Sequence, residues 1–441
     1  MSIDILIYNG KVLTGSARIP FLDPGYLAIS EGKIIDLGKG RPTDAILMQA
    51  KKVISARDKL VMPGLINSHT HAAMSIFRGL VDDLPLDDWL KRIFSLEKRF
   101  VNKEFVYWGS LLSGIEMIMT GTTCFADGYF YEGAVAKACL ELGIRAVLAQ
   151  AVIDFPTPDV LEPSENLKVA EDFLRTWKEY SLIFPAIFAH APYSCSAKTL
   201  KEAKALANDY QTLFFIHAAE TKWEVEKIKN DHGEAPISYL YELNILDEDT
   251  VLVHVNWISK EEIEILKGTG AKVVHNPESN MKLGSGLSPV PDLLKEGIVV
   301  GLGTDSCASN NNLDLFQEMD TAAKVHKGWR KNPIVMPAEQ VLNMATSYGA
   351  RVLGLKKIGR LGKGKDADII LINLNCPHLF PIYNPYSHIV YAMKGADVDT
   401  VIIQGKIIME NRKIASVSIE TVMEKVILLS EKIKRSLKKS R

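Results

Sequence analysis

The sequence predicts an α/β protein in which a (β/α)8 barrel stands beside a small β-sandwich domain formed by both chain ends. Eight compact apolar runs cross the middle of the chain, six of them ending in a polar residue, and each is followed by a helix-like stretch. Apolar strands that alternate with helices are typical of a parallel sheet covered on both faces. Eight such units in about 245 residues match a barrel in number and size. A doubly wound open sheet, the alternative, needs no particular number of strands.

The order of segments predicts the domains. The eight runs are 61–69, 121–127, 144–152, 183–190, 213–220, 250–255, 271–275 and 299–305. Shorter strand-like segments precede them at 5–8, 27–29, 33–36 and 52–54, and similar ones follow at 368–372 and 400–406. Turn residues at Asn9-Gly10 and Glu31-Gly32 indicate hairpins. We expect the sandwich from 1–60 and 358–415, the barrel from 61–357, and a C-terminal helix with a basic tail over 416–441. Apolar spacing over 419–437 predicts that helix, and its tail is interpreted as a solvated helix end.

The composition excludes several classes of protein. The 441 residues are 47% hydrophobic, with 52 Lys and Arg against 53 Asp and Glu. This balance argues against disorder and against a nucleic-acid partner. No apolar run reaches the roughly 18 residues of a membrane span, and the first residues lack a signal-peptide pattern. Five cysteines without a CxxC pair indicate reduced thiols, so we expect a cytoplasmic protein with no membrane partner.

Polar side chains suited to metal binding stand at the ends of the predicted barrel strands. Six of the ten histidines fall at these ends, where catalytic groups of such barrels collect. The polar strand-end residues are His69, His71, Asp127, His190, His217, Glu220, His254, His275 and Asp305. A single histidine at such a place is more often a packed core residue, but several that converge on one rim favour a metal site.

Four of these residues form the preferred ligand set. His69 and His71 are two residues apart, so their side chains point the same way from an extended strand. We expect one divalent metal ion per subunit on His69, His71, His217 and Asp305, with water in the remaining position. Zn²⁺ is the first candidate, and Fe²⁺ or Mn²⁺ also suits three imidazoles and a carboxylate.

Two further residues are predicted to act on protons and charge. Glu220 lies three residues beyond His217 and can carry a proton between the metal-bound water and a substrate. The metal would lower the pKa of that water towards about 7. His254 would orient the hydroxide or stabilise oxyanion charge. A solvent-facing loop carboxylate is the alternative for Glu220.

Other candidate sites are weaker. The segment 301–304 is glycine-rich but lacks a phosphate-loop pattern. Cys195 and Cys307 are disfavoured as nucleophiles beside a metal site, and the cytidine-deaminase zinc signature is absent from the sequence. The remaining histidines are interpreted as structural: His232, His326, His378 and His388.

Several segments resemble a known superfamily. VMPGLINSHTH at 61–71, HAAE at 217–220 and GLGTDS at 301–306 resemble the amidohydrolase superfamily. HNPESNMKL at 275–283 and ASNNNLD at 308–314 resemble the 5′-methylthioadenosine/S-adenosylhomocysteine deaminases within it, although triazine hydrolases share much of this pattern. The resemblance spans nearly the whole chain.

This resemblance implies the same barrel and sandwich, the same four metal ligands, and a homo-oligomer, either a dimer or a tetramer. It also implies a mononuclear site, because His190 ends the strand where binuclear relatives carry a carboxylated lysine. Glu220 would deliver a proton to adenine N1, His254 would assist the attacking hydroxide, and Asp305 would take up its proton. The products would be a hypoxanthine nucleoside and ammonia. A triazine chlorohydrolase, a guanine-type deaminase and a non-catalytic scaffold homologue are the alternatives.

The resemblance also implies substrate contacts. Glu97 and His190 match positions that face the ribose, and Glu220 and Asp305 complete the set around the small-molecule nucleoside. Trp89 either walls the same pocket or is a buried helix residue. Gln150 and Glu162 stand where some members carry arginines for the homocysteine carboxylate. We therefore expect methylthioadenosine, 5′-deoxyadenosine and adenosine to be preferred over S-adenosylhomocysteine.

Overall fold

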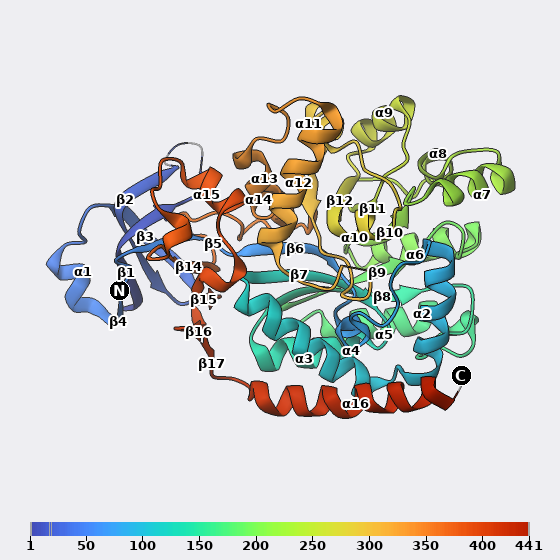
Figure 1. Cartoon of the computed structure of the whole chain (residues 1–441), viewed down its shortest axis with the longest axis horizontal. Helices are drawn as coiled ribbons and strands as arrows, with labels where there is room; N and C mark the ends of the chain where they lie inside the picture. The colour runs from blue at the N-terminus through green and yellow to red at the C-terminus, as the bar shows by residue number, and fades with distance from the viewer. Residues whose placement is uncertain (1, 17, 19, 440–441) are drawn as a thin grey trace.

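The computed structural model describes residues 2–16, 18 and 20–439. Figure 1 shows a β-rich part, made from the two ends of the chain, beside a larger part in which helices surround parallel strands. The strands of the larger part form one eight-stranded parallel sheet, ordered as in the sequence from β6 to β13. The predicted fold class is confirmed.

Each of the eight apolar runs contributes one strand to this barrel. The strands are β6 (Leu65–Thr70), β7 (Thr122–Tyr129), β8 (Arg145–Val152), β9 (Ile183–Ala189), β10 (Phe214–Ala218), β11 (Thr250–His254), β12 (Lys272–His275) and β13 (Val300–Leu302). The sheet curls until its first and last strands meet, where the Asp305 N–H donates to the His69 carbonyl at 3.0 Å. The Asn67 side chain also bridges this seam, because its amide donates to Thr304 Oγ1 at 2.7 Å and its oxygen accepts from the Thr304 N–H at 3.1 Å. The candidate metal ligands of the first and last barrel strands, His69 and Asp305, are therefore neighbours in space.

Helices cover the outside of the barrel (Figure 1). They are α2 (Leu86–Phe100), α3 (Lys103–Met119), α4 (Glu132–Leu142), α5 (Asn166–Trp177), α6 (Ala197–Asp209), α7 (Lys222–His232), α8 (Pro236–Glu242), α9 (Lys260–Thr269), α10 (Pro277–Lys282), α11 (Val290–Lys295), α12 (Leu315–Arg330), α13 (Ala338–Met344) and α14 (Ser347–Val352), with short 3-10 turns η1 (Ala72–Phe77) and η2 (Pro163–Glu165). Several begin at a hydroxyl side chain that accepts a backbone N–H of the first turn, as Ser196, Thr221 and Ser259 do. Such caps satisfy N–H groups that have no partner within the helix.

The first apolar run contains two strands that belong to different sheets. β5 (Lys59–Pro63) pairs with β1 (Ile3–Leu13) and β14 (Ile369–Asn373), and the chain enters the barrel as β6 only after Gly64. A Cβ at Gly64 would lie 2.1 Å from Thr123 Oγ1, so only glycine permits this close approach. The expectation of one strand over 61–69 is corrected in this respect.

The two ends of the chain pair in one mixed sheet, as predicted. Its other strands are β2 (Phe21–Ser30), β3 (Lys33–Lys39), β4 (Ala50–Ser55), β15 (Val398–Ile403), β16 (Lys406–Glu410) and β17 (Lys413–Ile414). Glu31-Gly32 forms the turn between β2 and β3. Asn9-Gly10 is no turn but a register shift inside β1, because pairing with β2 continues past it. The segment 400–406 likewise comprises the end of β15, a turn and the first residue of β16. The short helices α1 (Asp44–Gln49) and α15 (Pro385–Tyr391) and the turns η3 (Pro377–Leu379) and η4 (Gly395–Asp397) complete this part.

The C-terminal helix is confirmed as α16 (Ile419–Lys439). It runs along α3, and Val422 and Ile433 on its apolar face are buried (Figure 1). Ser440 and Arg441, the end of the predicted basic tail, lie outside the described residues. Across the described part of the chain, no helix has both the length and the apolar character needed to cross a membrane. The division into domains at residues 60, 357 and 415 stays a prediction.

Candidate metal centre and substrate pocket

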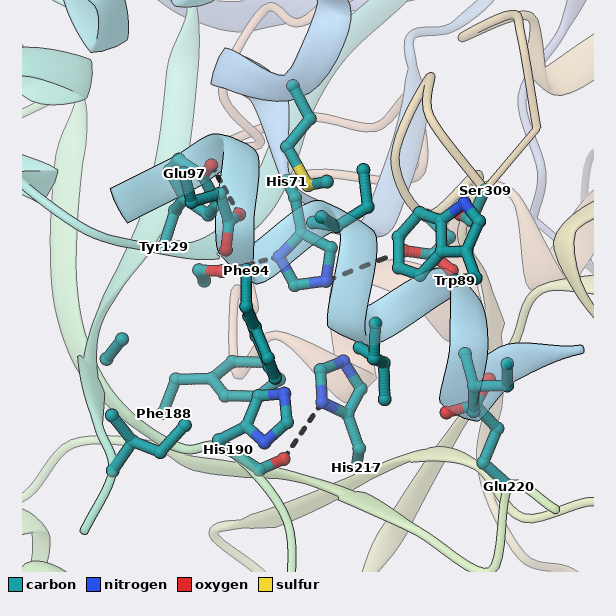
Figure 2. A pocket seen from close by; sticks show the side chains of 18 of the residues that line it. His71, Trp89, Phe94, Glu97, Tyr129, Phe188, His190, His217, Glu220 and Ser309 are labelled. Atoms are coloured by element: carbon teal, nitrogen blue, oxygen red, sulfur yellow. Dashed lines mark hydrogen bonds and ion pairs between the residues drawn. The ribbon is translucent and has the colours of Figure 1, made fainter. Parts of the chain in front are cut away.

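A pocket opens at the carboxyl ends of the barrel strands. Strand ends supply His71, His190, His217, His254 and Asp305 to its lining, and α2 covers it from one side. Figure 2 shows His71 and His217 in the middle of the pocket, with Glu97 and Tyr129 on one side and Glu220 on the other. The structure therefore brings the predicted site residues into one cavity, with His69 packed beside them.

Three histidines are close enough together to hold one metal ion. Ring nitrogens of His69, His71 and His217 all lie within 4.8 Å of one another. His71 Nδ1 lies 2.6 Å from the Gly128 carbonyl and His217 Nδ1 lies 2.8 Å from the His190 carbonyl. Because a carbonyl only accepts, each Nδ1 carries the proton and each Nε2 presents its lone pair. His69 Nε2 is buried and has no hydrogen-bond partner among the described residues, which is the environment of a metal ligand.

Asp305 supplies the negative charge of this centre. Its Oδ1 atom lies 3.6 Å from His69 Nε2 and 3.5 Å from His71 Nε2. Burial lowers the pKa of His69 to about 4 and that of His217 well below its usual value. Burial alone would raise the pKa of Asp305, but the neighbouring histidine rings hold it well below its usual value. Neutral imidazoles beside one carboxylate fit a divalent cation, with Zn²⁺ among the candidates.

Hydrogen bonds through two asparagine side chains link the other two functional candidates, His254 and Glu220. His254 Nε2 lies 3.8 Å from Glu220 Oε2. His254 Nδ1 donates to Asn280 Oδ1 at 2.8 Å, and the Asn280 amide donates to Asn256 Oδ1 at 2.8 Å. The Asn256 amide in turn donates to the Glu220 carbonyl at 2.9 Å. These bonds fix both the tautomer of the His254 ring and the backbone position of Glu220. Burial raises the pKa of Glu220, which favours a protonated, donating form of its side chain.

The profile of the Amidohydrolase family matches residues 60–408, which include every residue of this centre. The chain belongs to the amidohydrolase family. Over 439 residues, 99% of each chain, it is 46% identical to a protein of Syntrophus aciditrophicus named 5-methylthioadenosine/S-adenosylhomocysteine deaminase 1. It is 43% identical over 411 residues to a Methanothermobacter thermautotrophicus protein named 5′-deoxyadenosine deaminase, covering 91% of this chain and 92% of that one. These relatives confirm the resemblance stated from the motifs.

A solved structure resembles this amidohydrolase along its whole length. It is a zinc-bound adenosine deaminase from Xanthomonas campestris, with a TM-score of 0.95 and 32% identity. The match covers 98% of this chain and 99% of that structure. The bound zinc of that protein agrees with a metal site in the fold, while the metal of the present chain stays a proposal.

The ribose-facing candidates also line the pocket of this amidohydrolase. Glu97 is buried on α2 and accepts a hydrogen bond from the Tyr129 hydroxyl at 2.6 Å. His190 Nδ1 lies 2.8 Å from Ser194 Oγ, which leaves Nε2 free to face the cavity, and burial lowers the pKa of His190 to about 3. Trp89 lines the pocket and is also a buried residue of α2, so the two interpretations of it do not exclude each other.

Gln150 and Glu162 do not reach the pocket. The Gln150 amide donates to Asp159 Oδ2 at 2.8 Å, and Glu162 is exposed to solvent. The wall near them is apolar, with Ala151 and Ile153 in the lining. None of the described lining residues is Lys or Arg. A negatively charged substituent would therefore find no cationic partner on this wall.

Two polar strand ends have other partners than the metal centre. Asp127 Oδ1 accepts from the Thr70 hydroxyl and from the Ala72 N–H, both at 2.6 Å, so it braces the turn that carries His71. His275 Nε2 lies 3.1 Å from His326 Nε2, and both side chains are buried. Neither belongs to the cluster of ring nitrogens around His69.

Sequence reasoning missed the residues that hold the catalytic candidates in place. Both carboxylate oxygens of buried Glu224 accept backbone N–H groups, from Ala219 at 2.9 Å and from Glu220 at 2.8 Å. Thr221 and Glu224 have the Thr-x-x-Glu spacing of a helix-capping box, which could have drawn attention to this turn. Tyr129, Asn256 and Asn280 carry no comparable local pattern.

Proposed function

We propose that this amidohydrolase is a metal-dependent deaminase that converts 5′-substituted adenosines to hypoxanthine nucleosides and ammonia. The placement of two buried carboxyl groups carries the proposal. Glu97 and Glu220 lie on opposite sides of His71 and His217 (Figure 2), so one can hold the ribose while the other serves the base. The names of the relatives at 43–46% identity support the same chemistry.

The proposed ligands are His69, His71, His217 and Asp305, and the proposed ion is Zn²⁺, as in the similar solved structure. When bound, such an ion makes hydroxide available at neutral pH. Asp305 accepts a proton from the nucleophile, since its carboxylate is ionised. Glu220, whose pKa is raised by burial, gives a proton to adenine N1 as C6 is attacked. His254 orients the nucleophile, and its position is fixed by Asn280.

Overall, water adds at C6 and the exocyclic nitrogen leaves as ammonia. One proton of this water would replace the proton that Glu220 gives to N1, and the other, accepted by Asp305, would pass to the leaving group. The enzyme is regenerated without an oxidant or reductant. A cytoplasmic location, a dimer or tetramer, and the lack of nucleic-acid and membrane partners stay predictions.

The 5′-substituent preference is tested by comparing four nucleosides. We expect methylthioadenosine, 5′-deoxyadenosine and adenosine to exceed S-adenosylhomocysteine in kcat/KM by about 10-fold or more, because one unpaired charge costs about 1.4 kcal/mol or more in a pocket without Lys or Arg. Absorbance and ammonia release follow each reaction, and a chelator must abolish them. A higher kcat/KM for S-adenosylhomocysteine would refute the preference. Turnover of a chlorotriazine instead of any adenosine would refute the proposed function.

The buried Glu97 carboxyl group is expected to lower the free energy of unfolding at neutral and alkaline pH. Burial raises its pKa from 4.5 to about 8, so the native state holds a proton that the unfolded chain releases. Stability should therefore fall as pH rises from about 5 to 8. Glu97→Gln keeps the Tyr129 acceptor and should raise the free energy of unfolding by about 2–5 kcal/mol above pH 8, with little effect near pH 4.

Urea unfolding at several pH values measures this difference, and kcat/KM should fall in the same variant by about 10-fold. Glu141→Gln is the matched control, since Glu141 pairs with Tyr107 on the surface. An equal pH dependence in wild type and Glu97→Gln would show that Glu97 is not the group that titrates.

A further inference from the structure

A second cluster of potential metal ligands lies in the β-rich part of the molecule. Cys376, His378 and Asp397 each offer one donor atom, and these atoms all lie within 4.8 Å of one another. His378 Nε2 is 2.9 Å from Asp397 Oδ2. None of the three lines the pocket at the barrel mouth.

The antiparallel pairing of β14 with β15 creates this cluster. Cys376 follows the end of β14 and Asp397 directly precedes β15, so the register of the two strands brings both to one edge. The short turn η3 then adds His378 between them. Figure 1 shows β14, β15 and α15 on the side of the molecule opposite to α2. The cluster is therefore separate from the candidate active site.

The surroundings leave these donors available. Asp397 is 7% exposed and is held by the Lys394 N–H, which donates to its Oδ2 at 2.9 Å. His378 is 47% exposed and gives a route from solvent. The Cys376 thiol makes a weak hydrogen bond to the Asn373 carbonyl, at 3.9 Å, and also interacts with the Asp397 carboxylate. Burial and the nearby Asp397 carboxylate raise the pKa of Cys376, so its thiol stays protonated until a cation takes the place of the proton.

We propose that Cys376, His378 and Asp397 bind a second divalent cation, with Zn²⁺ as the best fit. A thiolate, an imidazole and a carboxylate are the three ligand types of protein zinc sites. With bonds of about 2.0–2.3 Å, ligands to one tetrahedral zinc lie about 3.3–3.7 Å apart. The three donors are thus within about 1.5 Å of that spacing before any ion binds, and a water molecule would complete the coordination.

The proposed site would link the two ends of the segment between β14 and β15. That segment contains α15, which contacts α12 and α13 of the barrel. An ion on Cys376 and Asp397 fixes the two points at which the segment leaves and rejoins the sheet. The site is structural, and it is expected to leave the reaction at the barrel mouth unchanged.

Cobalt titration of the metal-free full-length protein distinguishes the two sites. A thiolate on Co²⁺ gives a sulfur-to-metal absorption band in the near ultraviolet, and the proposed active-site ligands contain no sulfur. The other four cysteines are buried: Cys124, Cys139, Cys195 and Cys307. We expect two bound equivalents and a thiolate band in the wild type. Cys376→Ser should lose the band and one equivalent, while deaminase turnover stays within about twofold of wild type.

His378→Ala is the second variant. The cobalt affinity measured from the thiolate band should fall at least 10-fold in this variant, as expected for a lost ligand. His388→Ala is its control, because His388 is a half-buried histidine of the same segment whose ring nitrogens contact the Asn384 and Pro381 carbonyls. One equivalent without a thiolate band in the wild type would overturn the proposal, and so would a band that survives Cys376→Ser. The result does not depend on the identity of the substrate.

Discussion

Glu220→Gln is expected to lower kcat by about 10²–10⁴-fold while the active-site metal is retained. Glutamine keeps the size of the side chain and its contact with Ser285, whose hydroxyl lies 3.3 Å from Glu220 Oε1. It cannot donate or accept the proton that adenine N1 requires. Because Glu220 is not one of the four proposed ligands and pairs with His254 instead, metal content should equal that of the wild type.

Turnover of the best adenosine substrate and metal analysis on the same preparation test this expectation. Glu226→Gln is the matched control, since Glu226 is exposed on α7 and lies 3.7 Å from Lys222. Near-wild-type turnover in Glu220→Gln would exclude the proton-transfer role. Loss of metal in that variant would instead make Glu220 a ligand.

The strand ends were predictable because strand geometry places their side chains without knowledge of the rest of the chain. His69 and His71 share one side of a strand by their spacing, and His217, His254 and Asp305 each follow a short apolar run. A closed parallel barrel then gathers all strand ends on one rim. Local sequence therefore contains the information needed to place the candidate ligands on one rim.

The supporting residues depend on contacts between segments that are distant in sequence. Tyr129 meets Glu97 only because α2 crosses the barrel mouth, and Asn280 meets His254 across 26 residues. Asn9-Gly10 was misread for the same reason: its local turn preference yields to the pairing of β1 with β2. An asparagine that orients a histidine has no periodic or compositional pattern by which it can be recognised.

Two residues of the same site have strained backbones, which could not be read from the sequence. His254 and Asp305 have φ angles of 78° and 59°, in the left-handed region that non-glycine residues rarely adopt. Strain of this kind typically costs about 1–3 kcal/mol and persists where the surroundings fix the residue. The Asn280 bond to His254 and the Ser279 bond to Asp305, at 2.8 and 2.6 Å, are such fixing contacts.

Asp305→Asn is expected to remove both metal and turnover, with kcat lower by at least about 10³-fold. The carboxylate has two tasks, because Oδ1 faces His69 and His71 while the whole group must accept a proton. An amide loses the negative charge that would offset a divalent cation held by three neutral imidazoles. Its NH2 group would also face a donor, either the Ser279 hydroxyl or the Ser306 N–H, so that one present hydrogen bond is lost.

Metal content is best compared in a Cys376→Ser background, where only the active-site ion is counted. Asp292→Asn is the control and should change neither quantity, because Asp292 is a half-exposed carboxylate on α11 that pairs with Arg330. If Asp305→Asn keeps its metal but loses turnover, Asp305 carries a proton without being a required ligand. If it keeps both, the proposed centre is wrong. Because Glu220→Gln should retain the metal and Asp305→Asn should lose it, the two variants together separate proton transfer from metal binding.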